Sequence, residues 1–354
     1  MKTLCLVTPD LYGSHGGIAR ITRVLCRALG EQAERCGWRL VVHSLHDKKG
    51  ALPDPLVRMA YHPYGSSRAR FASSVLSTVQ DSNTVAVVYT HVNHAPLSRM
   101  SRAPHFVVAH GVDVWSPLSA MRTEGLRQAR AVWSVSDYTS RVVRGLHGVE
   151  RARTIHNCLA LDVEHTEAKS SRSILLVSRL AGKTEGKRID DAIRAFAHAQ
   201  RHLGLEGWTL DIVGDGPLRA TYEALARESC VEGSVCFHRG ISDDALKSLY
   251  QRCGFFSLPS VNEGFGLVFL EAMSFGKAVV AACAGASPEV VRDGVTGIIT
   301  APGDIEELAS AYARLARDEA LRDALGGRGR LEVQRRFGYE AYRDAVAREL
   351  GEVA

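Results

Sequence analysis

The chain has 354 residues, of which 45% are hydrophobic and 23% are charged. A domain averages about 150 residues, so this length favours two domains, and the composition excludes collagen, coiled-coil and disordered proteins. The sequence contains no run of about 18 uncharged apolar residues and therefore predicts no membrane-spanning helix.

The start of the chain and its cysteines indicate a reducing compartment. Residues 1–9 are apolar and predict a strand, without the basic region, longer apolar stretch and cleavage site of a secretory signal. The eight cysteines form no C-x-x-C pair, which argues against a zinc site and a disulfide framework. We therefore expect a cytoplasmic protein that needs no metal ion.

The net charge of +5 is unevenly distributed along the chain. Residues 1–168 hold 20 Lys and Arg against 13 Asp and Glu, whereas residues 169–354 hold 24 against 26. A basic first half suits a phosphate-bearing substrate or an anionic membrane surface, although a solvated surface excess gives the same count. No basic cluster is interleaved with aromatic residues, so nucleic acid is not an expected partner.

Short Val-rich runs in the first half are typical of strands that are buried on both faces. The predicted strands are 3–8, 40–45, 84–89, 105–109 and 131–135. An apolar stripe from Ile18 to Leu29 predicts a helix that opens after Gly16-Gly17 and ends at Gly30. A strand, a glycine turn and a helix begin a βαβ unit.

A second alternating series follows and predicts a second doubly wound parallel sheet. Its predicted strands are 173–178, 209–213, 235–237, 255–258, 278–282 and 297–300. Its predicted helices are 191–201, 218–228, 243–252, 267–275 and 305–317.

The fold class is therefore α/β, with two Rossmann-like domains and a separate C-terminal helix. The polar stretch 162–172 lacks apolar periodicity and predicts the linker. We expect the domains at 1–166 and 167–336, with the C-terminal helix in 337–354, after a helix break at Gly326 to Gly329.

The Gly16-Gly17 pair is the first candidate binding element. Glycines let the backbone approach a ligand closely, and the free N–H groups at a helix start favour an anion. A tight turn without a ligand is the alternative interpretation of such a pair.

Further candidates follow strands of the second series. Arg179 stands directly after a strand and Lys187 lies in the next loop, at the edge where doubly wound sheets bind ligands. Solvated charges in a surface loop are the alternative interpretation of these two residues. Gly214 and Gly216 permit close approach of a flat or phosphorylated ligand. They lack the G-x-G-x-x-G spacing, so a redox dinucleotide is not supported.

Two glutamates and a histidine complete the candidates. Glu263 lies in a glycine-rich loop and Glu271 on the following apolar helix. A carboxylate accepts two hydrogen bonds from the vicinal hydroxyls of a sugar or a ribose, whereas a helix cap and a salt bridge are the structural alternatives. His110 follows a strand end, where a histidine is more often structural than catalytic.

Taken together, these segments resemble the retaining glycosyltransferases of family four, which have the GT-B fold of two facing Rossmann-like domains. The matching segments are GGIAR at 16–20, HGVDVW at 110–115, SVSDYTS at 134–140, SRL at 178–180, GKRIDDAI at 186–193, VGDGP at 213–217 and the run from EGFG at 263–266 to KAVVA. Glu263 and Glu271 reproduce the E-x7-E motif of that family.

The resemblance implies a role for each candidate residue. Arg179 and Lys187 are expected to bind the donor diphosphate, with the Gly16-Gly17 turn reaching it from the opposite domain. Glu271 is expected to hold the donor ribose, and His110 to lie by the donor sugar. The remaining donor contacts that the resemblance implies are Glu263, Gly264, Phe265, Gly266 and Leu267 at the sugar, and Gly214, Gly216, Arg239, Gly240 and Ile241 near the base.

The implied activity is transfer of a hexose from a UDP-hexose or GDP-mannose type donor to a hydroxyl, with retention and without a metal ion or cofactor. The basic first half favours a glycan or lipid-linked acceptor at the inner face of the plasma membrane, in bacterial envelope polysaccharide or lipopolysaccharide synthesis. A soluble aglycone and a non-catalytic nucleotide-sugar-binding scaffold are the alternatives. One departure from the family is Lys187-Arg188, where many members have Lys-Gly, and the family's C-terminal helix commonly crosses back to the first domain.

Overall fold

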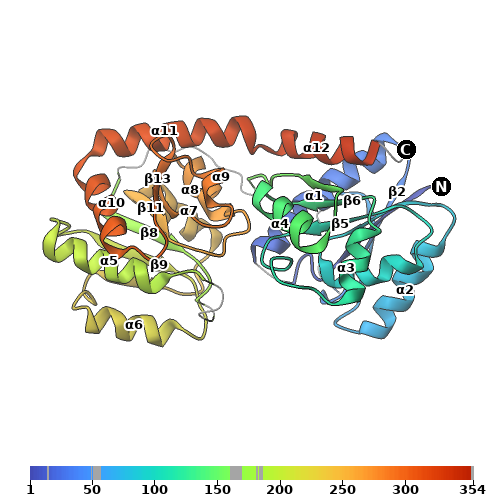
Figure 1. The fold of residues 1–354 in the computed structure, drawn as a ribbon, viewed down its shortest axis with the longest axis horizontal. Helices are drawn as coiled ribbons and strands as arrows, with labels where there is room; N and C mark the ends of the chain where they lie inside the picture. Colours follow the sequence, from blue (N-terminus) through green and yellow to red (C-terminus); the bar gives the residue numbers. More distant parts are fainter. Residues whose placement is uncertain are drawn as a thin grey trace. The chain divides into compact units, whose positions relative to one another are not determined.

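The computed structural model describes residues 1–13, 16–48, 50, 57–159, 170–180, 182 and 186–351. The chain forms two compact units, Met1–Ala160 with Gly338–Ala354, and Leu161–Phe337. Each unit contains one sheet, and all the strand pairs of both sheets are parallel (Figure 1). Most of the predicted linker, residues 162–169, lies outside the described residues.

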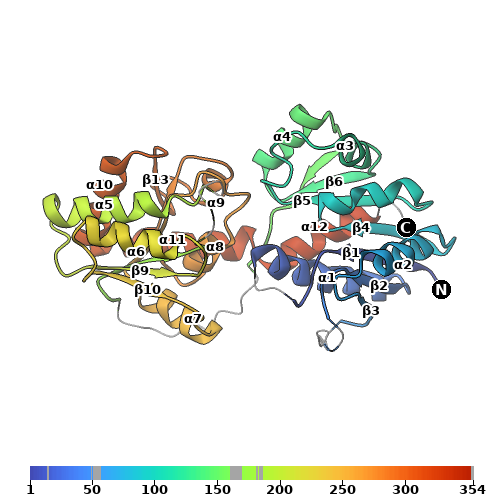
Figure 2. The same cartoon turned by 90° about the horizontal axis from the view of Figure 1, so that it is seen from below.

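The first unit holds a seven-stranded sheet in the order β3-β2-β1-β4-β5-β6-β7 (Figure 2). Its strands are β1 (Thr3–Thr8), β2 (Arg39–Ser44), β3 (Met59–Pro63), β4 (Thr84–Tyr89), β5 (His105–Ala109), β6 (Ala131–Ser134) and β7 (Ala152–Thr154). Its helices are α1 (Gly17–Arg35), α2 (Arg68–Gln80), the 3-10 helix η1 (Val92–Met100), α3 (Ala120–Arg127), α4 (Asp137–His147) and α12 (Tyr339–Gly351). The five strands predicted for this half are confirmed, and the two edge strands β3 and β7 are additional.

The second unit holds a six-stranded sheet in the order β10-β9-β8-β11-β12-β13. Its strands are β8 (Ser173–Val177), β9 (Thr209–Val213), β10 (Val235–His238), β11 (Phe255–Leu258), β12 (Val279–Ala282) and β13 (Gly297–Thr300). Its helices are α5 (Ile189–His202), α6 (Arg219–Glu228), α7 (Asp243–Arg252), α8 (Leu267–Ser274), α9 (Ser287–Val290), α10 (Ile305–Arg317) and α11 (Glu319–Arg336). All six predicted strands and all five predicted helices are present.

The predicted helix end at Gly30 and the predicted break at Gly326 to Gly329 are both wrong, because Gly30 and Gly326 allow close packing. Helix α1 continues through Gly30, where a Cβ atom would lie 2.8 Å from Cγ1 of Val57. Helix α11 runs through the predicted break, and a Cβ atom at Gly326 would lie 1.8 Å from the carbonyl oxygen of Gly276. In both helices the glycine lacks a side chain, so a neighbouring segment can pack closely against it, and the helix continues.

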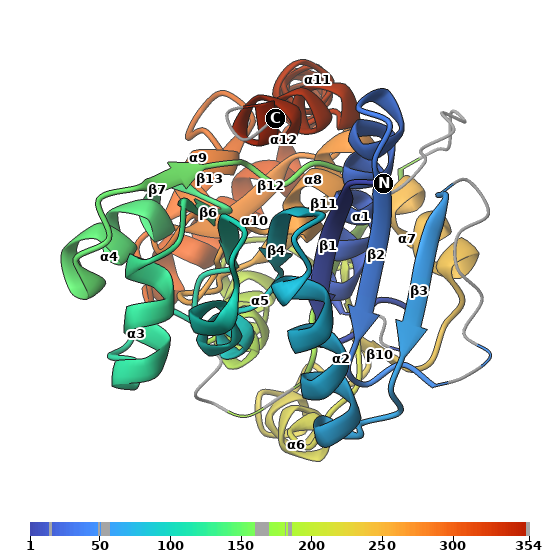
Figure 3. The same ribbon diagram turned by 90° about the vertical axis from the view of Figure 1, so that its right-hand side faces the viewer.

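Helix α12 belongs to the first unit, as the resemblance implies, and packs against α1 (Figure 3). The hydroxyl of Tyr339 donates a 2.7 Å hydrogen bond to Oε1 of Glu31, and the Arg27 guanidinium lies 4.3 Å from the Tyr339 ring centroid. Tyr342 and Val346 bury their side chains on the inner face of the helix. Among the described residues, no helix combines the length and hydropathy needed to cross a membrane.

Two buried histidines make the first unit sensitive to acid. Burial lowers the pKa of His43 and that of His94 to about 4, and the side chains are 1% and 7% exposed. In the unfolded chain both histidines titrate near pH 6.5. Between pH 6.5 and pH 4 the unfolded state therefore binds more protons than the folded state, and the free energy of unfolding decreases as the pH is lowered. At pH 5 the loss is on the order of 2 kcal/mol for each histidine.

We therefore expect the Tm of the first unit to fall by about 10 °C between pH 7 and pH 5. Scanning calorimetry at several pH values measures this slope. The exposed His202 on α5 of the second unit supplies the control, because His202→Gln should leave the slope of the first unit as it is, whereas His94→Gln should reduce it. A Tm that is flat from pH 7 to pH 5 would contradict the assignment.

Candidate active site

The predicted cations and Glu263 lie at the switch point of the second sheet. The chain leaves β8 for β9 and β10 on one side and returns to β11 on the other side of β8. Ligands of doubly wound sheets bind at the carboxyl ends of two such strands, where their connections diverge. Arg179 follows β8, Lys187 lies before α5, and Glu263 follows β11.

Lys187 and Glu263 form an ion pair across this switch point. The Lys187 Nζ atom lies 2.8 Å from Oε2 of Glu263, and the two side chains are 21% and 14% exposed. Arg179 is exposed on the adjoining loop. The structure therefore brings together a lysine and a carboxylate that are 76 residues apart in the sequence.

Backbone contacts at Gly186 hold the Lys187 loop against the end of β11. The Val261 N–H donates to the Gly186 carbonyl at 2.8 Å, and Oγ of Ser260 donates to the same oxygen at 3.3 Å. Gly186 has a φ of 63°, and a Cβ atom there would lie 2.8 Å from the Asn262 side chain. Only glycine allows both this φ and this contact without strain.

Arg188 explains the departure from the Lys-Gly pattern. Its φ of 54° lies in the left-handed region that glycine favours, so the loop keeps this conformation with an arginine in place. The Arg188 Nε atom lies 2.6 Å from Oδ2 of Asp191, which is 2% exposed. The additional cation thus pairs with the first turn of α5, and this charge-assisted hydrogen bond offsets the backbone strain.

The predicted base-side residues adjoin the Arg179 loop. Gly214 has a φ of 149°, and a Cβ atom there would lie 1.8 Å from the Ser178 carbonyl oxygen. Gly216 packs in the same way on the Leu180 carbonyl. Nε of Arg239 lies 2.8 Å from the carboxylate of Asp215, between these glycines. Gly240 and Ile241 follow Arg239 in the loop before α7.

Helix α8 presents the second glutamate of the motif. Glu271 is 3% exposed, and the Tyr250 hydroxyl donates to its Oε2 atom at 2.9 Å. Gly266 caps the helix with a φ of 94°. The side chain of Phe265 is 3% exposed and packs edge-to-face on Phe337, with ring centroids 5.6 Å apart. Gly264 and Leu267 are half-buried on the same turn.

In the first unit, β1 and β4 form the corresponding switch point. Gly16 is the N-cap of α1 and Gly17 is its first residue, and both are exposed. Apart from its chain neighbours and the backbone of its own helix, no atom of the described residues lies within 4 Å of the position that a Cβ of Gly16 would take.

Asp47, which the sequence analysis missed, organises the loop before this turn. Its buried carboxylate accepts the N–H groups of Leu11, Tyr12 and Gly13 at 2.9, 3.1 and 2.6 Å. Burial opposes its ionisation, but the hydroxyl of Tyr61, that of Ser44 and these N–H groups outweigh burial and lower the pKa of Asp47. The carboxylate is therefore ionised at neutral pH.

His110 is held as a neutral imidazole. Its Nε2–H donates to the Thr90 carbonyl at 2.7 Å, so Nδ1 keeps its lone pair. Burial lowers the pKa of His110 to about 4. Its backbone N–H donates to Oδ1 of Asp113 at 3.0 Å, which fixes the loop. At neutral pH the side chain can therefore accept a hydrogen bond from a hydroxyl group at Nδ1.

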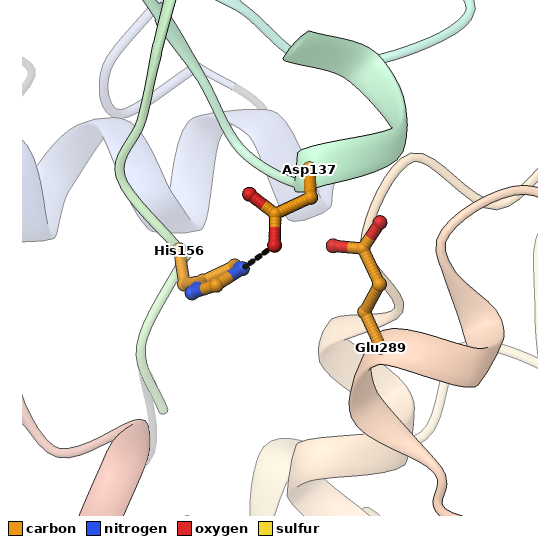
Figure 4. Close-up of side chains that lie close together, drawn as sticks. All are labelled: Asp137, His156 and Glu289. Carbon is orange, nitrogen blue, oxygen red and sulfur yellow. Dashed lines mark ion pairs between the residues drawn. The ribbon is translucent and has the colours of Figure 1, made fainter. Parts of the chain in front are cut away.

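Four further polar residues line the same carboxyl edge and were not predicted. His91 follows β4, Asp113 follows β5, Asp137 follows β6 and His156 follows β7. Figure 4 shows the Asp137–His156 pair, in which Nε2 and Oδ2 are 3.8 Å apart; Glu289, also drawn, lies on α9 of the second unit. The signal that identifies such residues is their position directly after successive parallel strands.

Comparisons with known proteins agree with this architecture. Residues 160–332 match the family model described as Glycosyl transferases group 1. The GDP-mannose-dependent alpha-(1-6)-phosphatidylinositol monomannoside mannosyltransferase of Mycolicibacterium smegmatis is 28% identical over 85% of this chain and 80% of its own length. The D-inositol 3-phosphate glycosyltransferase of Actinosynnema mirum is 36% identical, but the match spans 43% of this chain and 38% of that relative.

Solved structures share the fold over nearly the whole chain. Anabaena Alr3699/HepE in complex with UDP has a TM-score of 0.75 and 20% identity, covering 99% of this chain and all of that one. Sucrose-phosphate synthase from Thermosynechococcus elongatus has a TM-score of 0.77 and 20% identity, covering 99% and 98%. The chain therefore has the GT-B fold, and its residues 160–332 match the Glycosyl transferases group 1 family.

Proposed function

We propose that this protein transfers a hexose from a nucleotide diphosphate sugar to a hydroxyl acceptor, with retention of the anomeric configuration. The observation that carries the proposal is the Lys187–Glu263 pair beside Arg179 at the switch point of the second sheet. The match of residues 160–332 to the Glycosyl transferases group 1 model and relatives named as glycosyltransferases support the same reaction class.

The geometry suits a leaving nucleoside diphosphate. As the bond from the anomeric carbon to the diphosphate oxygen breaks, negative charge builds on the diphosphate and positive charge on the sugar. Arg179 and Lys187 stabilise the diphosphate, and Glu263 orients the sugar and stabilises its positive charge. The acceptor oxygen bonds to the anomeric carbon on the same face, and its proton passes to the departing phosphate oxygen.

The proposed donor is of the UDP-hexose or GDP-mannose type. Glu271 binds the ribose hydroxyls, and Tyr250 fixes the orientation of its carboxylate. The loops at Gly214 and Arg239 flank the base. The name of the Mycolicibacterium relative specifies GDP-mannose, and the HepE structure contains UDP, so the two bases are the first to compare.

The proposed acceptor is a lipid-linked sugar at the cytoplasmic face of a membrane. The surplus of seven positive charges in residues 1–168 favours an anionic surface. The Mycolicibacterium relative is named for a phosphatidylinositol monomannoside acceptor, which is of this chemical class.

A ligand-induced shift of thermal unfolding tests the donor site. Saturation at about 100 times Kd adds about 2.7 kcal/mol, a shift of several degrees, so UDP-, GDP-, ADP- and dTDP-sugars are compared with and without a chelator. We expect one nucleotide series to raise Tm, chelator to have no effect, and Lys187→Ala to reduce the shift. No shift with any series would contradict the proposed donor site.

The product tests the reaction. With the donor that shifts Tm, incubation with a lipid-linked sugar should yield a glycosylated lipid whose new linkage, by NMR, has the donor's anomeric configuration. A product of inverted configuration, or release of free sugar alone, would contradict the proposal. Equal turnover with a soluble aglycone would contradict the lipid acceptor.

A further inference from the structure

A small hollow opens at the edge of the first unit's sheet, apart from the candidate active site. Its volume is about 230 Å³. It is lined by three arginines, two apolar residues and one glutamate: Arg130, Arg151, Arg153, Phe106, Ala131 and Glu349.

The hollow lies at the amino ends of the strands. Arg130 directly precedes β6, Arg151 directly precedes β7, and Arg153 is the second residue of β7. Because the strands of this sheet are parallel, their amino ends share one edge, and His110 after β5 lies at the opposite edge. The hollow is therefore separate from the polar residues at the carboxyl edge.

Strand register places the arginines beside an apolar floor. Ala131 pairs with Phe106, and Trp133 pairs with Arg153, so alternation along the strands puts these side chains on one face of the sheet. Arg151 is two residues before Arg153 and faces the same side. The Phe106 and Trp133 rings stack with centroids 4.7 Å apart. This stack gives the guanidinium groups a rigid apolar base.

Two of the guanidinium groups at the hollow, those of Arg151 and Arg153, are exposed and stay protonated at all relevant pH values. Within the described part of the chain, neither Arg151 nor Arg153 forms an ion pair. Like charges around one small space repel, and a bound anion relieves that repulsion.

We propose that this hollow binds a phosphate group. The planar fork of a guanidinium matches two phosphate oxygens, and several arginines around one space are suited to a dianion. The volume is below the roughly 300–1,000 Å³ of sites for drug-sized ligands, so it suits a phosphate group and not a whole nucleotide sugar. The site does not depend on the proposed glycosyl transfer.

Charged side chains on an edge strand also prevent pairing with other chains, and that role needs no ligand. The two roles differ in their response to substitution. If the arginines only protect the edge, Arg151→Gln/Arg153→Gln lowers solubility and leaves phosphate affinity unchanged.

Isothermal titration with inorganic phosphate tests the site. The titration uses an Arg179→Ala/Lys187→Ala background, so that phosphate at the proposed donor site does not contribute. Adding Arg151→Gln/Arg153→Gln should weaken phosphate binding at least tenfold. The matched control is Arg68→Gln/Arg70→Gln, which removes the same charge from exposed positions of α2 in the same unit and should bind like the background.

The protein that carries Arg151→Gln/Arg153→Gln is called the pocket variant. Equal phosphate affinity in the pocket variant and the Arg68→Gln/Arg70→Gln control would overturn the proposal. The absence of phosphate binding in the Arg179→Ala/Lys187→Ala background would overturn it as well. Arg151→Lys/Arg153→Lys keeps the charge without the planar fork and should bind with intermediate affinity. If the glutamine variant folds poorly, the lysine variant still separates the effect of the guanidinium groups from the effect of net charge. A phosphate affinity of the lysine variant equal to that of the background would overturn the guanidinium assignment.

Vesicle sedimentation distinguishes the two sources of a phosphate group. If the ligand is a lipid headgroup, vesicles containing phosphatidic acid bind the protein, free phosphate competes, and the pocket variant loses binding relative to the control. If the ligand is a soluble phosphate, the titration shows binding while vesicle association is equal in the pocket variant and the control.

Discussion

Replacement of Lys187 by alanine is expected to lower kcat/KM for the sugar donor by about 10- to 150-fold. A charge-assisted hydrogen bond is worth about 1.5–3 kcal/mol, and each 1.4 kcal/mol is about a factor of ten. The interaction should strengthen as the diphosphate gains charge, so kcat should fall more than KM rises. Steady-state kinetics with the donor identified by thermal shift measures both constants.

Part of that loss is structural, because Lys187 also neutralises Glu263 at 2.8 Å. Without the lysine, the half-buried Glu263 carboxylate lacks its ion-pair partner, which lowers the free energy of unfolding. The double variant Lys187→Ala/Glu263→Gln removes the charge of both and should restore thermal stability without restoring turnover. Lys247→Ala on α7, a lysine of the same unit, is the matched control. A kcat/KM of Lys187→Ala equal to that of Lys247→Ala would contradict the assigned role.

The central strands of both sheets were predictable because burial on both faces requires continuous apolar runs. The edge strands β3 and β7 were not, since all five residues of β3 are half-buried or exposed and β7 has only three residues. The glycines Gly30 and Gly326 led to wrong predictions of where helices are interrupted. Both lie inside helices, where they allow a neighbouring segment to pack closely, and the local sequence does not distinguish such a glycine from one that ends a helix.

In the candidate site, too, some residues were predictable from the sequence and others were not. The positions of Arg179, Lys187 and Glu263 after strands were predictable, and Glu263 and Glu271 share the E-x7-E motif. Asp47 was not, because its role arises from contacts with a loop more than 30 residues earlier in the chain. The pairing of Tyr250 with Glu271 likewise depends on α7 and α8 lying together, which no local pattern encodes.

Replacement of Asp47 by alanine is expected to lower the free energy of unfolding of the first unit by on the order of 3–5 kcal/mol. The substitution removes a 0% exposed carboxylate and leaves three backbone N–H groups and the hydroxyls of Ser44 and Tyr61 without their acceptor. Each buried donor left unpaired costs about 1–3 kcal/mol, less whatever water recovers. At about 2–4 °C per kcal/mol, the Tm should fall by about 10 °C.

The same carboxylate predicts how this difference depends on pH. Because the folded state lowers the pKa of Asp47, its ionised form contributes stability above its unfolded value of about 3.9, and the contribution is lost as pH falls through the folded pKa. The gap in Tm between wild type and Asp47→Asn should therefore be full at pH 6 and shrink in strong acid. Glu34→Ala, which removes a carboxylate that is 55% exposed, should shift Tm by a degree or two at most. Calorimetry of wild type and the three variants measures these differences. An Asp47→Ala Tm within a degree of that of Glu34→Ala would show that the loop before Gly16 does not depend on this carboxylate.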